Sequence, residues 1–254
     1  VASAVGNLGA INAQMGNFRA ALGFFQRGLE IREAVLRPDH PRVADDLNNL
    51  AALRIEMGEV EVARPLLERA LAIREEALGP EHPQVATSLR TLGDVLADAG
   101  KFAEAKPLYD RALSIQEAAW GPDHVEVAYV LNNLGSLLRR EGEFEEAKSV
   151  LERALSIWEE TPGPDHPDLG AVLDNLARVQ MSLGKYGEAE ALLGRALRIE
   201  EEALGPDHPH LAQTLGSFAE LLRLMGRTGE AEEHEARAQA IREAQEAGGG
   251  SVKG

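Results

Sequence analysis

Apolar residues recur along this chain at the spacing of one face of an α-helix. Val43, Leu47, Leu50 and Ala51 fall at i, i+4, i+7 and i+8, which predicts an amphipathic helix from about residue 41 to residue 57. Gly58 follows, and a glycine that adopts positive φ commonly ends a helix. A second helix, with an apolar stripe of its own, is predicted to run to about residue 78. Its inward positions are Ala63, Leu66, Leu67, Ala70, Leu71 and Ile73.

This helical hairpin repeats every 42 residues without an insertion. A loop of the form Gly-Pro-acidic-His-Pro joins one hairpin to the next, with Arg37 in place of the first glycine and Val125 in place of the last proline. The loop histidines are His40, His82, His124, His166 and His208. A proline suits the first turn of a helix, and the residues before it are candidate caps. Because one hairpin cannot bury its own apolar face, we expect stacked neighbours to cover it.

Six periods account for nearly the whole chain. We expect an array over residues 1–247, followed by a flexible Gly/Ser tail or linker over residues 248–254. The repeats are expected at approximately 1–40, 41–82, 83–124, 125–166, 167–208 and 209–247. One position on each helix is always small, so helix axes should approach closely. These small positions are Gly9, Ala51, Gly93, Gly135, Ala177 and Ala219 on the first helices, and Ala70, Ala112, Ala154 and Ala196 on the second.

The pattern of repeated positions resembles a known family. Leu50-Ala51, Ala63 and Ala70 match the Leu-Gly/Ala, Ala, Ala skeleton of the tetratricopeptide repeat. The 42-residue period and loops such as Gly163-Pro164-Asp165-His166-Pro167 resemble the kinesin-light-chain type of that repeat. The resemblance implies an all-α fold, a right-handed α-α superhelix (solenoid) of six helix-turn-helix units. It also implies a concave groove, lined by the first helices, that binds peptide segments of other proteins.

The two ends of the array differ in polarity. The last second helix carries His234-Glu235 and Gln239 where the other repeats have leucine, and a polar outer face suits a terminal capping helix. The first repeat begins with Val1, Ala2 and Val5 and has no polar cap before it. We therefore expect that a segment precedes Val1 in the natural protein, and that self-association through this uncapped repeat is an alternative.

Charge and composition exclude several classes of partner. The formal net charge is −16, which argues against nucleic acid and against an anionic membrane surface. No apolar run approaches the roughly 18 residues of a membrane span. The chain has no cysteine, which excludes disulfides and thiolate chemistry. We expect a cytoplasmic protein, although a chain without cysteine folds equally well in reducing or oxidising surroundings.

The five loop histidines do not predict a metal site. Successive repeats stack on the order of 10 Å apart, whereas ligands of one ion all lie about 2 Å from it. We interpret the histidines as caps and turn-packing residues. No arrangement of nucleophile, base and orienting group stands out, and no cofactor motif is complete. The sequence therefore predicts neither an enzyme, nor a cofactor, nor a bound metal.

Polar residues on the exposed faces of the first helices are the candidate binding site. An asparagine recurs in one column, and its amide can donate and accept at once, which suits the backbone of a bound peptide. Alternatively, these amides tie one helix to the next repeat. Asp45, Thr87 and Ala171 stand where a dicarboxylate clamp would need lysine, so binding of chaperone tails is not expected. The candidate groove residues are Asn7, Asn49, Arg90, Tyr129, Asn132, Asn133, Arg139, Arg140, Asn175 and Arg178.

We expect the groove to change sign along its length. Repeats two and three contribute mainly acidic residues, whereas repeats four and five contribute Arg139, Arg140 and Arg178 against Asp174. The acidic part of a bound peptide should lie over these arginines.

The leading interpretation is therefore a non-enzymatic interaction module that holds a peptide segment in its groove, either from a partner protein or from a missing domain of its own. Three alternatives remain: a regulatory or sensor array of a larger multidomain effector such as a protease or NTPase, a self-associating structural solenoid, and an enzyme with a scattered site.

Overall fold

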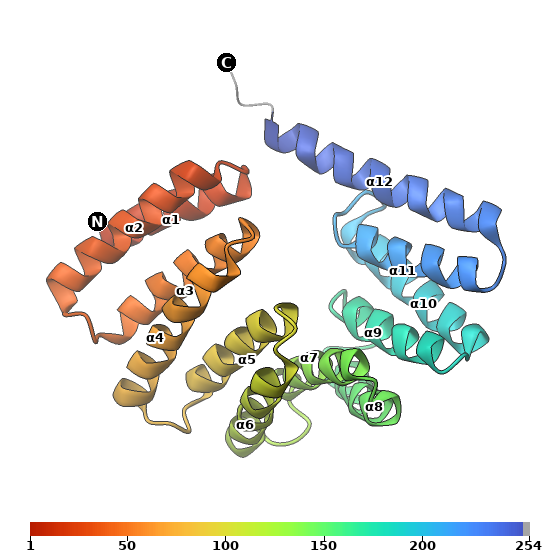
Figure 1. The fold of residues 1–254 in the computed structure, drawn as a ribbon, viewed down its shortest axis with the longest axis horizontal. Helices are drawn as coiled ribbons and strands as arrows, with labels where there is room; N and C mark the ends of the chain where they lie inside the picture. The colour runs from red at the N-terminus through yellow and green to blue at the C-terminus, as the bar shows by residue number, and fades with distance from the viewer. Residues whose placement is uncertain (251–254) are drawn as a thin grey trace. The chain divides into compact units, whose positions relative to one another are not determined.

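The computed structural model describes residues 1–250, and over that range the chain forms twelve α-helices and no strand (Figure 1). The predicted all-α fold of paired helices is confirmed. The helices fall into two compact units, residues 1–119 and residues 120–248. The first set of six helices is α1 (Ala2–Gln14), α2 (Phe18–Leu36), α3 (Pro41–Glu56), α4 (Val60–Leu78), α5 (Pro83–Asp98) and α6 (Phe102–Trp120). The second set is α7 (Val125–Glu141), α8 (Phe144–Glu160), α9 (Leu169–Ser182), α10 (Tyr186–Leu204), α11 (Leu211–Leu224) and α12 (Thr228–Gly250).

In the first unit, each hairpin packs on the next through the apolar stripes that the sequence predicts. Phe25 of α2 shares a buried cluster with Leu50 and Leu53 of α3, so the second helix of one repeat covers the first helix of the following repeat. The small positions permit this close packing. A Cβ atom added at Gly93 would lie 2.8 Å from the Tyr109 ring, and one added at Gly9 would lie 2.8 Å from the Phe25 ring.

In the second unit, the first helices of the three hairpins contact one another directly, α7 against α9 and α9 against α11. Their partners α8 and α10 pack behind them, and Leu193 of α10 joins Ala177 of α9 and Leu221 of α11 in one buried cluster. Gly135 again marks a close approach, because an added Cβ would lie 2.5 Å from Leu151. The first helices of this unit therefore lie side by side, α9 between α7 and α11.

His40, His82 and His124 cap the helices that follow them, as the sequence predicts, whereas His166 and His208 make the same bond within the turns that precede α9 and α11. In all five loops the Nδ1 atom accepts a hydrogen bond from the backbone N–H two residues further on, at 3.1–3.3 Å. The first N–H groups of a helix have no partner within the helix, so each such bond satisfies one of them. The Nδ1 atom of each loop histidine therefore has a structural role in its turn.

Helices α9 and α11 begin two residues later than the repeat pattern predicts. Pro167 and Asp168 precede α9 as a tight turn, and Pro209 and His210 precede α11 in the same way. The bonds from Leu169 N to His166 O and from Gly170 N to Pro167 O span three residues, as in a 3₁₀ turn. The four turn residues lie at one end of the surface formed by the first helices.

A column of arginines on the second helices joins each repeat to the loop before it. Arg111 of α6 donates to the carbonyl oxygen of Pro80 at 2.9 Å and forms an ion pair with Glu75. Arg195 repeats both contacts, with Pro164 and Glu159. The other members that bond to a proline carbonyl in the same way are Arg69, Arg153 and Arg237.

The end of the chain differs in extent from the predicted array. Helix α12 continues to Gly250, three residues past the expected boundary at residue 247, so residues 248–250 of the predicted tail have helical backbone. Residues 251–254, the rest of that tail, lie outside the described residues. Glu235 and Gln239 of α12 are exposed, whereas His234 is half-buried and stacks on Phe218 of α11, so the predicted polar face is observed in part. Among residues 1–250, none of the helices combines the length and the apolar character needed to cross a membrane.

Candidate functional site

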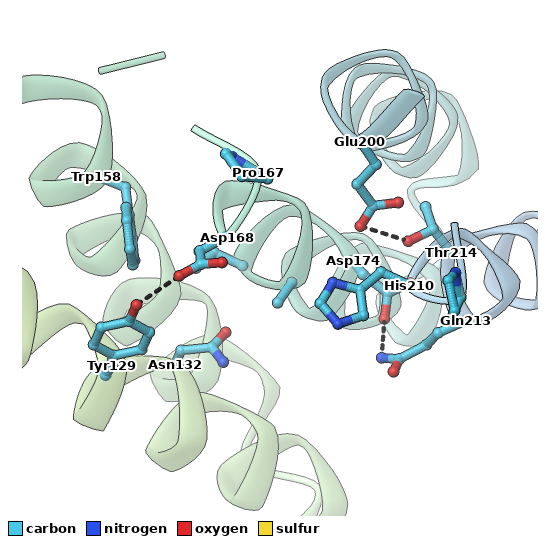
Figure 2. Close-up of a pocket in the computed structure, with 13 residues that line it drawn as sticks. Tyr129, Asn132, Trp158, Pro167, Asp168, Asp174, Glu200, His210, Gln213 and Thr214 are labelled. Carbon is cyan, nitrogen blue, oxygen red and sulfur yellow. Dashed lines mark hydrogen bonds between the residues drawn. The ribbon is translucent and has the colours of Figure 1, made fainter. Parts of the chain in front are cut away.

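Two pockets lie on the first-helix surface of the second unit. The larger, about 420 Å³, lies where α7, α9 and α11 begin, and we call it the acidic pocket (Figure 2). It is lined by Tyr129, Asn132, Trp158, Pro167, Asp168, Ala171, Val172, Asp174, Glu200, Pro209, His210, Gln213 and Thr214. The smaller, about 140 Å³, lies towards the ends of the same helices, and we call it the arginine pocket. It is lined by Arg139, Arg178, Met181, Ser182, Glu220 and Leu224.

The arginine pocket contains two of the predicted groove arginines. Arg178 donates from Nε to Asp174 Oδ2 at 2.9 Å and from Nη2 to Ser217 Oγ at 2.6 Å. These two bonds, one to its own helix and one to α11, hold its guanidinium at the pocket wall. Glu220 lies at the edge of hydrogen-bond range, with 4.0 Å between its Oε2 and Arg178 Nη1.

Arg139 has fewer hydrogen-bond partners for its guanidinium than Arg178 has. Its Nε is buried and has no hydrogen-bond partner among the described residues. Burial lowers the pKa of the Arg139 guanidinium, and the positive charge of Arg178 nearby lowers it further. Both causes disfavour the charged form, so an anion that entered this pocket would relieve them. Arg140, the third predicted arginine, lies exposed on the same helix, α7.

The amide side chains lie between the two pockets. Asn175 of α9 donates to Asn132 Oδ1 of α7 at 3.0 Å, and Asn132 is within 3.4 Å of Asn133 Oδ1. The bond from Asn175 is a tie from one repeat to the next, the alternative role considered for this column. The three amides thus form a short series of polar contacts across α7 and α9.

The acidic pocket gathers three carboxylates from different elements (Figure 2). Asp168 accepts a hydrogen bond from the Tyr129 hydroxyl at 2.6 Å. Glu200 of α10 accepts from the Thr214 hydroxyl at 3.2 Å, and Asp174 accepts from the Gln213 amide at 3.3 Å. No lysine or arginine belongs to the described residues that line this pocket.

Glu200 is the most perturbed group of the site. Burial raises the pKa of its carboxyl from 4.5 to about 7, and the charges of Asp174 and Glu201 act in the same direction. The hydrogen bond from Thr214 opposes this shift only in part. Glu200 is not among the site residues predicted from the sequence, because those lie on the exposed faces of the first helices and Glu200 lies on the second helix α10.

Within the second unit, the sign of the charge changes along the first helices, a pattern that the sequence did not predict. Negative charge gathers where α7, α9 and α11 begin, and the two arginines lie towards their ends. The remaining predicted groove residues, Asn7, Asn49 and Arg90, belong to the first unit, where both asparagines are exposed. Arg90 pairs there with Asp94 at 3.5 Å.

Among the described residues, no group of three or more histidine and carboxylate side chains has an arrangement that could hold a metal ion. The loop histidines are separated along the array and engaged in caps or turns, which agrees with their interpretation as structural residues.

Comparison with known proteins identifies the repeat. The tetratricopeptide repeat family model matches residues 1–75, 46–118, 126–201 and 171–244. Among solved structures, the chain is similar to a Podosopora anserina protein of kinesin light chain type with nearly identical TPR-like repeats. That match has 26% identity and a TM-score of 0.67, and covers 79% of this chain and 94% of the other.

Two further structures share the fold. One is BtubC (BKLC) from P. vanneervenii, with 23% identity, a TM-score of 0.66 and coverage of 93% and 92%. The other is the apo form of RapI, with 14% identity, a TM-score of 0.69 and coverage of 97% and 99%. Among curated proteins, no significant sequence match is found.

Proposed function

The chain belongs to the tetratricopeptide repeat family, and on that premise we propose that it is a peptide-binding module whose site is the first-helix surface of the second unit. Proteins of this family are in general non-catalytic scaffolds for protein–protein interaction. The proposal adds a location and a chemistry to that role: a peptide segment with an acidic portion lies across α7, α9 and α11.

The observation that carries this proposal is the buried, unpartnered Nε of Arg139 beside the Arg178 guanidinium. Burying a cationic group without an acceptor costs free energy. A carboxylate of a bound peptide in this pocket would neutralise part of the repulsion between the two cations. Hydrogen bonds to charged groups contribute about 1.5–3 kcal/mol each, enough to make this contact a main source of affinity.

The amides of Asn132, Asn133 and Asn175 support the same placement. They lie on α7 and α9, with Asn132 in the wall of the acidic pocket, and an amide can donate to a peptide carbonyl and accept from a peptide N–H. Such contacts to a backbone are independent of its sequence. Specificity must then come from the charged pockets on either side.

The experiment is a selection followed by a titration. Random peptides displayed on phage are selected on the intact chain, and the affinity of the best acidic peptide is measured by fluorescence anisotropy over a range of salt concentrations. Arg140→Glu with Arg178→Glu should weaken binding by at least about tenfold and reduce the salt dependence. The helical circular dichroism spectrum should stay that of the parent.

The matched control is Lys148→Glu with Arg198→Glu, which changes the charge equally on the second helices α8 and α10. This control should bind the peptide as the parent does, apart from a small long-range effect of charge. If the groove variant binds every selected peptide with the affinity and salt dependence of the parent, the assignment of the surface is wrong.

A further inference from the structure

The acidic pocket gathers acidic side chains, and no lysine or arginine is among the described residues that line it. Glu200 is 5% exposed and its Oε2 has no hydrogen-bond partner, while Asp174 is 1% exposed and its Oδ1 has none. Asp174 receives one bond from Arg178, but Glu200 receives only the neutral hydroxyl of Thr214. Two buried carboxylates with unsatisfied oxygens line a hollow of about 420 Å³ (Figure 2).

The position of Glu200 holds arginine in three other repeats and a neutral side chain in two, as Arg32, Arg74, Arg242, Gln116 and Trp158. Arg32 and Arg74, which occupy the same repeat position as Glu200, both have partners within the chain. Arg32 pairs with Asp46 at 2.6 Å, and Arg74 donates to Ser88 at 2.6 Å. In repeat five the column is acidic, and the residue facing it from the next first helix is Thr214. Arg32 and Arg74 thus each have a partner on the next first helix, whereas the Oε2 atom of Glu200 has none.

A second departure from the repeat makes room for this carboxylate. Gly170 is the one glycine in a column that otherwise reads Ala2, Ala44, Ala86, Ala128 and Ala212. A Cβ atom at Gly170 would lie 2.3 Å from Glu200 Oε1. The carboxyl group of Glu200 can occupy its place in the wall only because residue 170 is glycine. The alanine found at this position in the other repeats would displace it.

The half-buried Tyr129 ring is the part of the aromatic wall that a flat cation would contact, since Trp158 is 2% exposed and packs against His166. Tyr129 and Trp158 meet edge to face, with 5.2 Å between ring centroids, and both line the pocket. Aromatic rings attract cations through their negative faces, and an arginine guanidinium also stacks on them. The acidic groups of the wall come from a loop and from two helices, as Asp168, Asp174 and Glu200. The five N–H donors of a guanidinium can reach acceptors in several directions in its plane, more than the three donors of an ammonium can.

We propose that the acidic pocket binds the guanidinium of an arginine side chain carried by the bound peptide. That the arginine comes from a peptide rests on the proposed function, whereas the pocket's preference for a guanidinium does not. An arginine here and an acidic residue over Arg139 and Arg178 would together fix the direction of the peptide across α7, α9 and α11.

The test uses a single capped amino acid, so that its result is independent of peptide binding. Nα-acetyl-arginine methylamide is titrated into the intact 15N-labelled chain and the two tryptophan indole N–H signals are followed by NMR. Trp158 lines the pocket, while Trp120 is 53% exposed and stacked on His124, and serves as the internal control. The Trp158 signal should shift with saturation and the Trp120 signal should not.

The neutral citrulline analogue and the lysine analogue are titrated in parallel. Both should bind at least about tenfold more weakly than the arginine compound. Absence of a saturable Trp158 shift with the arginine compound would overturn the proposal. Equal responses to arginine and citrulline would overturn the role of charge, and equal responses to arginine and lysine would overturn the assignment of a guanidinium.

Two matched variants test whether Glu200 of the pocket wall contacts the arginine compound. Glu200→Gln keeps the shape of the side chain and removes its charge, and it should weaken binding of the arginine compound at least about tenfold. Glu202→Gln removes the same charge from an exposed site on the same helix and should leave binding unchanged. Equal binding by both variants would overturn the proposal, even if a peptide still bound over the arginine pocket.

Discussion

Single residues are most informative in this protein where one repeat departs from the others. Arg37 has φ 75° and ψ 152°, a region that suits glycine, and the same loop position is Gly79, Gly121, Gly163 and Gly205 in later repeats. A side chain in such a conformation costs about 1–3 kcal/mol. The first loop of the array therefore stores strain that the other loops avoid.

Arg37→Gly should raise the free energy of unfolding by about 1 kcal/mol, because glycine adopts this conformation without the clash of a Cβ atom. Chemical denaturation followed by circular dichroism measures the change. Arg37→Ala is the control, since it removes the charged side chain and keeps the Cβ atom. A gain as large in the alanine variant would show that strain is not the cause.

Glu200 links stability to pH. Its pKa rises from 4.5 to about 7 on folding, so between these values the folded chain holds a proton that the unfolded chain has lost. Stability then falls as pH rises through this window. The full shift corresponds to a penalty on the order of 2–3 kcal/mol above pH 7.

Glu200→Gln should therefore be more stable than the parent at pH 8, and the difference should shrink as the pH is lowered towards 4.5. Denaturation midpoints of both proteins at matched pH values measure it, and other titrating groups cancel in the comparison. The acidic groups that face or adjoin Glu200 are Asp174 and Glu201, and both are present in parent and variant. A difference that does not change with pH would contradict the raised pKa.

At the scale of elements, the repeat is held by a few contacts that recur in the same register. Each bonded arginine of the second helices reaches the proline carbonyl of the preceding loop, and several also pair with a glutamate of the preceding second helix. Hydrogen bonds to charged groups of this kind stabilise more than neutral ones. The loop is thereby fixed to the helix that stacks beside it.

Arg111→Met should lower stability by about 1–2 kcal/mol, since it removes the bond to Pro80 and the ion pair with Glu75 while keeping an unbranched apolar stem. Thermal unfolding compares it with Arg19→Met, an exposed arginine of α2. Equal losses in the two variants would contradict the role given to this column.

Ala112 tests the close approach of helices. It is fully buried on α6, so Ala112→Leu should lower stability by about 1–3 kcal/mol through overpacking. Ala118→Leu on the same helix is exposed and should change stability by no more than about 0.5 kcal/mol. Denaturation midpoints decide the matter, and an unchanged midpoint for Ala112→Leu would contradict the register of the repeat.

The elements could be predicted because helix periodicity, turn glycines and small positions act locally and recur. The predicted helix over residues 41–57 is observed as Pro41–Glu56, and the predicted turn glycines Gly58 and Gly142 have positive φ. The late start of α9 was not predictable from its sequence, since Pro167 occupies the same place as Pro41, which does begin a helix. Contacts such as that of Asp168 with Tyr129 arise only when repeats stack.

The site could be predicted only in part. The asparagines and arginines were found because they recur on the exposed face of a helix. Glu200 lies on a second helix, and its importance comes from burial without a partner, which a single sequence does not report. Its column carries only a partial signal: Glu200 is acidic where positions 32, 74 and 242 hold arginine, but Gln116 and Trp158 depart from arginine as well.

For the molecule as a whole, charge and its local reversal determine which partners it can attract. A net charge of −16 repels acidic ligands at long range, and the two arginines of the arginine pocket act against that background at short range. Salt screens both effects, with a Debye length of about 10 Å at 0.1 M. Binding of an acidic peptide therefore depends on where on this acidic molecule the peptide lies.

Photo-crosslinking tests that location most directly. The intact chain carries benzoylphenylalanine either in place of Ser182, exposed on the first helix α9 at the arginine pocket, or in place of Ala191, exposed on the second helix α10. After irradiation with a selected acidic peptide, mass spectrometry measures the crosslinked fraction. The account predicts crosslinks from position 182 and few from position 191. Crosslinks from position 191 alone, or equally from both, would contradict a site on the first helices.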